Sequence, residues 1–283
     1  MISIKERGIV DQKSLKIKTF MRRFSMLKNK VKEMLKNGES TLGLVCNLIS
    51  PQLTEIFGLT GFDFDIFDME HGAYSFETLE KLVRVAKLYD MVPMARVPEN
   101  SPKTILRALD AGCLGIVVPQ IESKEEAQRF IDSTKYPPKG IRGTNWKTAA
   151  GQWGNYNASE YMAAADKNIL RIIQIETKTG LDNIEEIVSV EDIDVVLIGA
   201  SDLSASMGYP GNPGAPEVQE AIDHIIDTSK KAGIVIGGGG GTDKEKMADS
   251  QKRGVRMYFA NPAVFIRKNS QEIASSIKET FIY

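Results

Sequence analysis

The sequence predicts an α/β protein folded as a (β/α)8 barrel, also called a TIM barrel. Eight short apolar runs recur between residues 42 and 261. Amphipathic runs with a helical period separate them, and several end in glycine or a basic residue, as helix C-termini do. The apolar runs are hydrophobic throughout, which is typical of parallel strands covered on both faces. A six-stranded dinucleotide-binding sheet is the alternative, but eight runs and no GxGxxG after the first argue against it.

The expected strands and helices alternate along the chain. The strands cover residues 42–49, 63–69, 91–97, 114–120, 170–176, 194–200, 233–238 and 255–261. The clearest helical patterns cover residues 75–90, 101–112, 123–134, 180–190, 217–233, 243–254 and 265–279. Because parallel strands need long crossover connections, which are usually helices, this alternation predicts one closed barrel.

Bulk composition excludes several classes of function. The chain has 283 residues, 42% of them hydrophobic and 26% charged, as in an ordinary globular protein with a full core. A formal net charge of -1 argues against a main role in binding nucleic acid or an anionic membrane. No apolar run approaches the ~18 residues of a membrane span. Cys46 and Cys113 stand alone in apolar runs, so we expect buried free thiols in a cytoplasmic protein.

Two segments stand apart from the repeating pattern. Residues 1–24 are rich in Lys and Arg but lack the apolar core and cleavage site of a secretory signal. We expect a helical N-terminal extension there, with a transit peptide as the alternative, and a single barrel domain over residues 25–283. Residues 135–167 are too long for an ordinary barrel loop. Their Pro, Gly, Arg and aromatic content suggests an ordered loop over a site, or else an exposed insertion without a role.

Polar side chains gather where the expected strands end. Active sites in this fold lie at the C-terminal ends of the strands, so these positions test the prediction. The strand ends carry Asp68, Glu70, His71, Arg96, Gln120, Gln174, Glu176, Ala200, Ser201, Asp202 and the run Gly237–Gly241. The sequence therefore predicts one polar mouth. The glycine run predicts either open space at its edge or a flexible turn.

Two carboxylates at these ends are candidate metal ligands. Glu176 and Asp202 follow neighbouring strands, so their side chains can converge on a hard cation such as Mg²⁺ or Mn²⁺. Two protein ligands would leave most coordination positions for water and substrate, as a catalytic metal requires. Alternatively, Asp202 is simply an acidic residue in the first turn of a helix.

The other candidates are an arginine and a histidine. Arg96 ends an apolar strand and needs an anionic partner, either a substrate oxyanion or Glu70 in a structural salt bridge. His71 and Asp68 are three positions apart and could form a general base held by a carboxylate. His224 lies on its helix opposite the apolar stripe and is expected at the surface.

Five motifs together resemble those of the HpcH/HpaI family of metal-dependent class II pyruvate aldolases. They are FDMEH, PMARVPE, YPPKGIRG, QIETKTGLDN and IGASDLSASMGYPGNPGAPEVQ. The resemblance covers roughly residues 25–275. It implies a phosphoenolpyruvate/pyruvate-binding type of barrel that cleaves a 4-hydroxy-2-oxo acid into pyruvate and an aldehyde through a metal-stabilised enolate. Two departures are Ser201, where many relatives have proline, and the glycine run 237–241, where relatives carry bulkier residues.

The resemblance also implies a role for each candidate residue. Glu176 and Asp202 correspond to the metal ligands, Arg96 to the group on the substrate keto oxygen, and His71 with Asp68 to the proton-transfer pair. The substrate-binding residues are Gln174, near the metal, and the backbone amides around Ala200, Ser201 and Asp202, which would take the carboxylate.

The implied cofactor is a divalent metal, with Mg²⁺ as the first choice and Mn²⁺ or Co²⁺ as alternatives. The implied assembly is a homo-oligomer, a hexamer built as a trimer of dimers.

Three questions about the reaction stay open. The reaction could be that of an oxaloacetate decarboxylase or a macrophomate-synthase-like lyase, which needs the same enolate. The barrel could instead bind a small acid without catalysis. The base could be the His71/Asp68 pair or a water it polarises. A Schiff-base mechanism is the weaker reading, because Lys178 belongs to a turn after its strand.

Overall fold

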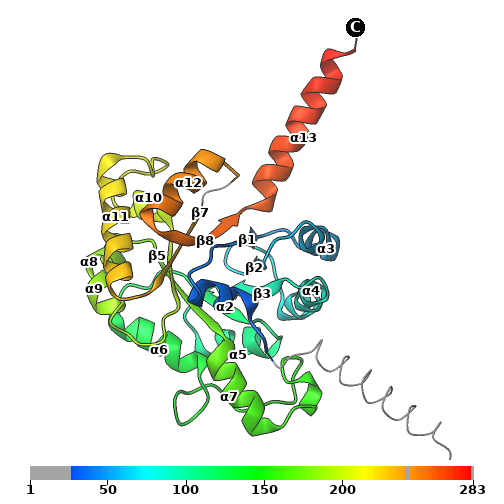
Figure 1. The fold of residues 1–283 in the computed structure, drawn as a ribbon, viewed down its shortest axis with the longest axis vertical. Helices are drawn as coiled ribbons and strands as arrows, with labels where there is room; N and C mark the ends of the chain where they lie inside the picture. The colour runs from blue at the N-terminus through cyan, green and yellow to red at the C-terminus, as the bar shows by residue number, and fades with distance from the viewer. Residues whose placement is uncertain (1–26, 240–241, 282–283) are drawn as a thin grey trace, which may run out of the picture.

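The structure, a computed structural model, describes residues 27–239 and 242–281. Within them, eight parallel strands pair in chain order and close into a barrel (Figure 1). The strands are β1 (Thr41–Cys46), β2 (Phe64–Asp68), β3 (Val92–Arg96), β4 (Gly115–Val118), β5 (Leu170–Ile175), β6 (Val195–Ile198), β7 (Val235–Gly239) and β8 (Val255–Ala260). The predicted (β/α)8 fold is confirmed. The predicted extension, residues 1–24, lies outside the described residues.

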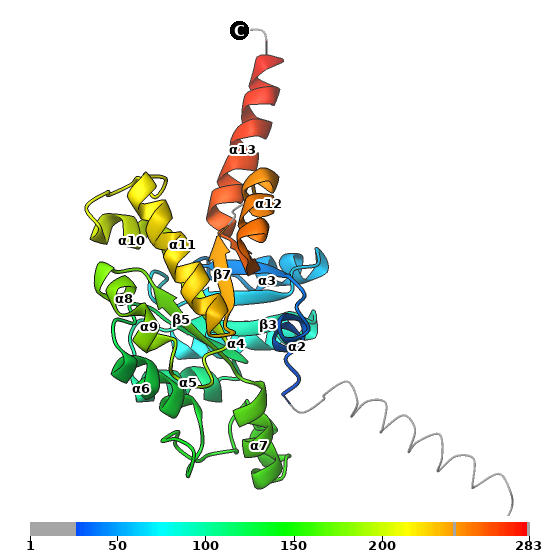
Figure 2. The ribbon, with the colours of Figure 1, turned by 60° about the vertical axis from the view of Figure 1, so that its left-hand side comes forward.

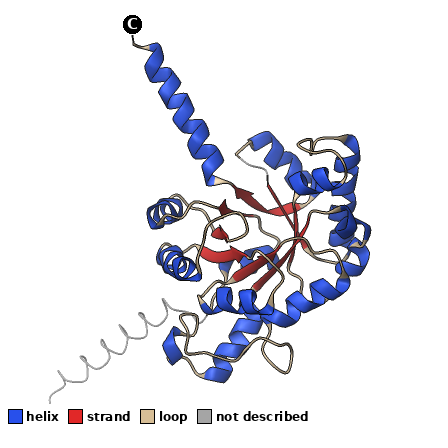
Figure 3. Cartoon of the chain, turned by 180° about the vertical axis from the view of Figure 1, so that it is seen from behind, coloured by secondary structure: helices blue, strands red, loops and turns tan. Residues whose placement is uncertain are grey.

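Helices surround the barrel (Figures 1 and 3). They are α2 (Lys30–Lys36), α3 (Pro51–Leu59), α4 (Phe76–Leu88), α5 (Pro102–Asp110), α6 (Lys124–Thr134), α7 (Ala158–Asn168), α8 (Lys178–Asp182), α9 (Ile184–Ile187), α10 (Ala200–Ser206), α11 (Pro216–Lys231), α12 (Lys244–Arg253) and α13 (Pro262–Glu279). Side-chain caps fix several helix starts. Ser75 Oγ accepts from the Thr78 amide at 3.1 Å before α4, and Ser123 Oγ accepts from the Glu126 amide at 3.2 Å before α6.

Strand side chains alternate between the barrel interior and the helix layer. Phe64 and Ile66 of β2 belong to the interior cluster, whereas Phe67 packs with the helices. Gly43 on β1 makes room for the Phe64 ring, because a Cβ at this position would lie 2.3 Å from Phe64 Cδ2. The interior is therefore a packed core that stops short of the C-terminal mouth.

Helix α2 closes the N-terminal end of the barrel. Val31 and Leu35 are buried in the interior cluster. Asn29, which precedes the helix, donates from Nδ2 to the carbonyl oxygens of Leu114 at 2.8 Å and Asn168 at 3.0 Å. These bonds attach α2 to the residues just before β4 and β5.

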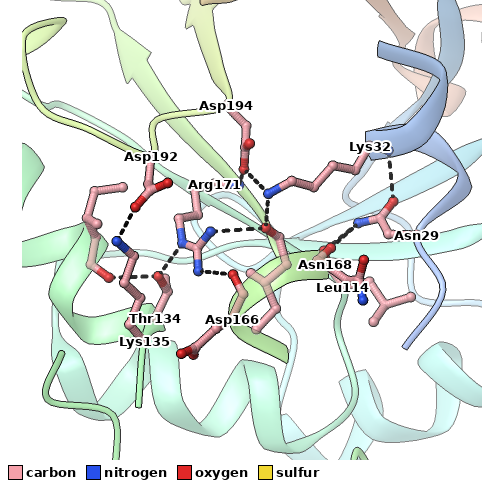
Figure 4. A network of polar contacts seen from close by, with 12 residues as sticks. Asn29, Lys32, Leu114, Thr134, Lys135, Asp166, Asn168, Arg171, Asp192 and Asp194 are labelled. Atoms are coloured by element: carbon pink, nitrogen blue, oxygen red, sulfur yellow. Dashed lines mark hydrogen bonds and ion pairs between the residues drawn. The ribbon is translucent and has the colours of Figure 1, made fainter. Parts of the chain in front are cut away.

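A charged network supports this closure (Figure 4). Lys32 Nζ donates to Asp194 Oδ2 at 2.8 Å, and the same oxygen accepts from the Arg171 backbone amide at 2.8 Å. The Arg171 side chain is only 2% exposed and donates to Thr134 Oγ1 at 2.7 Å and to the Asp166 carbonyl at 2.9 Å. The buried guanidinium thus ties α6 and the end of α7 to the base of β5.

Residues 135–167 lie at this same N-terminal end, so the expectation of a loop over the mouth is wrong. The segment follows α6 and leads into β5, and such helix-to-strand connections lie opposite the active-site face. Arg142 pairs with Asp110, the last residue of α5, at 2.9 Å, and the Ala150 amide donates to the Asp110 carbonyl at 3.2 Å. In Figures 1 and 2, α7 accordingly lies well away from α10.

Helix α13 leaves the barrel (Figures 1 and 2). Its first turn is anchored by Phe265, whose ring lies 5.8 Å from that of Phe57 on α3. Large apolar side chains of the helix are exposed, with Val264 at 57% in the first turn, and Ile273 at 61% and Ile277 at 51% farther along. This helix presents an apolar surface that the described part of the chain does not cover.

Two smaller predictions, on the cysteines and on His224, are confirmed. Cys46 and Cys113 are buried free thiols, and burial raises the pKa of each to about 12. His224 lies at the surface, with its ring Nε2 3.3 Å from Glu185 Oε1. In the described part of the chain, no helix is both long and apolar enough to cross a membrane.

Asp65 on β2 is fully buried, and neither of its carboxyl oxygens has a hydrogen-bond partner within the described chain. Burial raises its pKa from 3.8 to about 8. From about pH 4 to pH 8 the native chain therefore holds a proton that the unfolded chain has lost, so stability falls as pH rises through this window.

We expect Asp65→Val to raise the melting temperature at pH 7 and to flatten its decline between pH 5 and pH 8. The change removes a buried carboxyl that has no hydrogen-bond partner within the described chain. At about 1.4 kcal/mol per pKa unit, the raised pKa of this group corresponds to several kcal/mol of lost stability. The control is Asp90→Asn, because the Asp90 side chain is 91% exposed. Thermal unfolding at several pH values measures both variants, and an unchanged pH slope in Asp65→Val would contradict the assignment.

Candidate active site

A cavity of about 350 Å³ opens at the C-terminal ends of the strands. Its lining residues are Val45, Ile66, Arg96, Val117, Gln174, Leu197, Ile198, Gly199, Ala200, Ser201, Asp202, Phe259 and Asn261. The predicted residues Arg96, Gln174, Ala200, Ser201 and Asp202 are thus brought together around one space. Its floor is the apolar core of the barrel, because Ile66, Val117 and Leu197 also belong to the interior cluster.

Arg96 is held by carboxylates. Its Nε and Nη2 donate to the two oxygens of Asp68 at 2.9 and 2.7 Å, and Nε also lies 3.2 Å from Glu70 Oε2. Burial disfavours the guanidinium charge, but Asp68 and Glu70 outweigh burial and raise the pKa of Arg96. The side chain is therefore a fixed cation whose remaining N–H groups are available to a ligand in the cavity.

His71 lies beside a different carboxylate from the one expected. Asp68 Oδ1 accepts from the backbone amides of Glu70 at 3.2 Å and His71 at 3.3 Å, besides its bonds to Arg96. The His71 ring has its Nε2 3.8 Å from Glu70 Oε2, and its side chain is 61% exposed. Asp68 therefore positions Arg96 and the turn after β2, whereas Glu70 lies between the arginine and the imidazole.

Glu176 is buried behind the cavity wall. Its Oε1 accepts from the Gln120 backbone amide at 3.0 Å, and its Oε2 accepts from Gln174 Nε2. Burial raises the pKa of Glu176, and the nearby carboxylates of Glu70 and Asp202 raise it further. Gln120, which has a positive φ of 53°, contributes its backbone amide, a role that its side-chain type does not reveal.

The chain passes very close to Glu176 just after β6, at the N-cap of α10. A Cβ at Gly199 would lie 2.5 Å from Glu176 Oε2, so this approach requires glycine. The chain then enters α10, whose first residues include Ser201 and Asp202 on the cavity wall. Electrostatic repulsion from Asp202 acts on both Glu70 and Glu176, so these carboxylates share one region of the mouth.

The residues present fit a hard divalent cation that takes most of its ligands from water and substrate. Glu176 and Asp202 offer carboxylate oxygens, and their mutual repulsion would be relieved by a cation. The buried Gln174 Oε1 has no hydrogen-bond partner within the described chain. No cluster of three or more His, Cys, Asp or Glu side chains able to hold a metal occurs in residues 27–239 and 242–281, so protein ligands alone would not complete the coordination.

The glycine run at the mouth is only partly described. Gly237–Gly239 belong to β7, which ends one residue later than expected, and a Cβ at Gly237 would lie 3.2 Å from Val195 Cγ1. Gly237 is therefore tightly packed, while Gly240 and Gly241 lie outside the described residues. Lys178 begins α8 and forms an exposed ion pair with Asp182 at 2.7 Å.

Comparison with known proteins gives consistent matches. The profile of the HpcH/HpaI aldolase/citrate lyase family matches residues 41–257. The 5-keto-4-deoxy-D-glucarate aldolase of Klebsiella pneumoniae is 40% identical over 205 residues, which cover 72% of this chain and 79% of that protein. An HpcH/HpaI aldolase from Desulfitobacterium hafniense superposes with a TM-score of 0.84 at 28% identity, covering 89% of this chain and 97% of that one. A protein of the same family from Burkholderia cenocepacia gives a TM-score of 0.84 at 26% identity, covering 89% and 100%.

Proposed function

Because the chain belongs to the HpcH/HpaI aldolase/citrate lyase family and is a carbon–carbon lyase, we propose that it is a divalent-metal-dependent aldolase. It cleaves a 4-hydroxy-2-oxo acid into pyruvate and an aldehyde. The observation that carries the proposal is the Arg96 guanidinium, which two carboxylates hold in the wall of a cavity that Gln174 and Asp202 also line. The curated relatives are named for 5-keto-4-deoxy-D-glucarate, which is therefore the first substrate to test.

The chain's own groups bind and orient the 2-oxo acid. Arg96 donates to the 2-oxo oxygen, and the backbone amides at the start of α10, around Ser201 and Asp202, bind the carboxylate. Glu176 and Asp202 would hold the divalent cation, which when bound supplies Lewis-acid stabilisation of charge on the substrate oxygens. Gln174, fixed by its bond to Glu176, completes this side of the cavity.

Cleavage breaks one carbon–carbon bond and needs two proton transfers. A base removes the proton of the C4 hydroxyl, the C3–C4 bond breaks to form the aldehyde carbonyl, and its electrons move to C3 and the 2-oxo oxygen as the pyruvate enolate. Arg96 stabilises the oxygen that gains charge. Protonation of C3 then gives pyruvate.

We assign the proton transfer to His71, with Glu70 beside its ring. His71 is the imidazole at the mouth, and its exposed ring can exchange protons with solvent. Asp68 is committed to Arg96 and to two backbone amides, so its proposed role is to position Arg96.

Pyruvate release from a 4-hydroxy-2-oxo acid and from oxaloacetate, each with and without added Mg²⁺ or Mn²⁺, tests this function. We expect faster release from the hydroxy acid. Faster release from oxaloacetate would identify a decarboxylase that uses the same enolate. Tight binding of pyruvate without turnover of either compound would identify a binding protein and overturn the proposal.

We also propose a homo-oligomer in which α13 packs on a second copy of the chain. The support is the projecting helix with exposed Val264, Ile273 and Ile277. Ile273→Asp should lower the molecular mass measured by light scattering. Glu272→Asp, a matched substitution of a neighbouring charged residue, should leave the mass unchanged. An unaltered mass in Ile273→Asp would contradict a contact through this face.

A further inference from the structure

The cavity has two chemically different sides. One side carries the polar groups assigned above to the 2-oxo acid, which come from β3, β5 and the start of α10. The other side is formed by Val45 of β1, Phe259 of β8 and Asn261 just after β8, which we call the β1–β8 wall. Because β1 lies four strands from β5 in a closed eight-stranded barrel, this wall faces Gln174 across the axis.

The β1–β8 wall carries no charged side chain. Among the lining residues, which all belong to the described part of the chain, Arg96 is the single cation, and it already contacts Asp68 and Glu70. Glu176 and Asp202 lie on the opposite side and are assigned to the divalent cation. A carboxylate placed against the wall would therefore lose water without gaining a cation from the wall itself.

One polar group on this wall is available to a ligand. Asn261 Oδ1 is used as the N-cap of α13, where it accepts from the Ala263 amide at 2.9 Å. This bond fixes the amide and leaves its Nδ2, which has no hydrogen-bond partner within the described chain, as the free donor. An N–H donor recognises a hydroxyl or carbonyl oxygen, and Val45 and Phe259 supply apolar contact beside it.

We propose that the β1–β8 wall is the subsite of the aldehyde half and that it selects an uncharged, hydroxyl-bearing aldehyde through Asn261 Nδ2. The inference rests on the proposed aldolase function and adds the substrate class. It implies that the preferred 4-hydroxy-2-oxo acid carries one carboxylate, whereas a glucarate derivative carries two.

Three small aldehydes of similar size test the selection in the condensation direction with pyruvate. Glycolaldehyde carries a hydroxyl, propanal replaces this hydroxyl with a methyl group, and glyoxylate carries a carboxylate in place of the whole hydroxymethyl group. We expect kcat/KM for glycolaldehyde to exceed that for propanal by about 10-fold, the scale of one hydrogen bond. We expect glyoxylate to react more slowly than glycolaldehyde. Glyoxylate as the preferred aldehyde would overturn the inference.

Each variant is assessed by its ratio of kcat/KM for two aldehydes. Differences in the intrinsic reactivity of the aldehydes cancel when this ratio is compared with that of the wild-type protein. Asn261→Asp keeps a helix-capping oxygen but loses the N–H donor, so the glycolaldehyde-to-propanal ratio of kcat/KM should fall about 10-fold. A purely structural role for Asn261 would lower both rates and leave the ratio unchanged, which would overturn its role in selection.

Val45→Lys places a cation on the wall and should raise the glyoxylate-to-glycolaldehyde ratio about 10-fold, whereas Val45→Met, which lengthens the side chain without charge, should not. An equal change in both variants would overturn the charge argument. Exchange of the pyruvate C3 protons in deuterated water reports the enolate chemistry alone. Absent exchange would refute the proposed function, whereas normal exchange with a preference for glyoxylate would refute only this inference.

Discussion

Replacing Arg96 with lysine should lower kcat by about 100-fold or more, the scale of losing one donor to a developing oxyanion. Lysine keeps the positive charge but not the planar fork that bonds both oxygens of Asp68 while offering further N–H groups to the substrate. Steady-state pyruvate release measures the loss. Exchange of the pyruvate C3 protons in deuterated water should fall with it, since both require the same enolate.

The matched control for this variant is Arg84→Lys, because Arg84 forms an exposed ion pair with Glu80 on α4 and should keep full activity. Thermal unfolding of Arg96→Lys separates a catalytic loss from a folding loss. If the folded variant exchanged C3 protons at nearly the wild-type rate, Arg96 would not hold the enolate, and its role would be confined to the ion pair with Asp68.

Neutralising either proposed metal ligand should nearly abolish activity while the protein still folds. Glu176→Gln and Asp202→Asn keep the shape of each side chain but remove the negative charge that a divalent cation needs. A chelator should likewise inactivate the wild-type protein, and Mg²⁺, Mn²⁺ or Co²⁺ should restore it. If the two carboxylates served only in structural contacts, the variants would lose stability and keep turnover.

A direct measure of metal binding makes this test independent of activity. Mn²⁺ should raise the melting temperature of the wild-type protein, because a ligand that binds only the folded state stabilises it. The rise should vanish in both variants and persist in Asp182→Asn, which alters an exposed carboxylate on α8. Full activity after exhaustive chelation, together with trapping of a lysine by borohydride and pyruvate, would instead establish a Schiff-base enzyme.

The barrel could be predicted because its signals are local and repeated. Each strand is a short apolar run bounded by a helical pattern, and the order of eight such units fixes a parallel closed sheet. The cavity residues followed from the same rule, since strand ends converge in this fold. Arg96, Gln174 and Asp202 could therefore be placed at one mouth from their positions alone.

What could not be predicted depends on which side chains meet after folding. Asp68 and His71 are three residues apart, but the turn after β2 directs Asp68 to Arg96 and leaves His71 near Glu70. The composition of residues 135–167 suggests a loop over a site or an exposed insertion, whereas their place between a helix and the next strand, which the sequence already shows, puts them at the N-terminal end. The backbone amide of Gln120 acts through a positive φ that no side-chain pattern encodes.

Because α2 closes one end of the barrel, substrates and products must enter and leave at the other end. Val31, Leu35 and the apolar interior fill the N-terminal end, so the cavity has its opening at the mouth. Gln174, on the proposed pyruvate side, is 2% exposed, whereas Asn261, on the proposed aldehyde side, is only partly buried. For such a blind-ended site we expect the aldehyde to depart first and pyruvate last. In the synthetic direction we expect pyruvate to bind before the aldehyde, so that the two reactants bind in a fixed order.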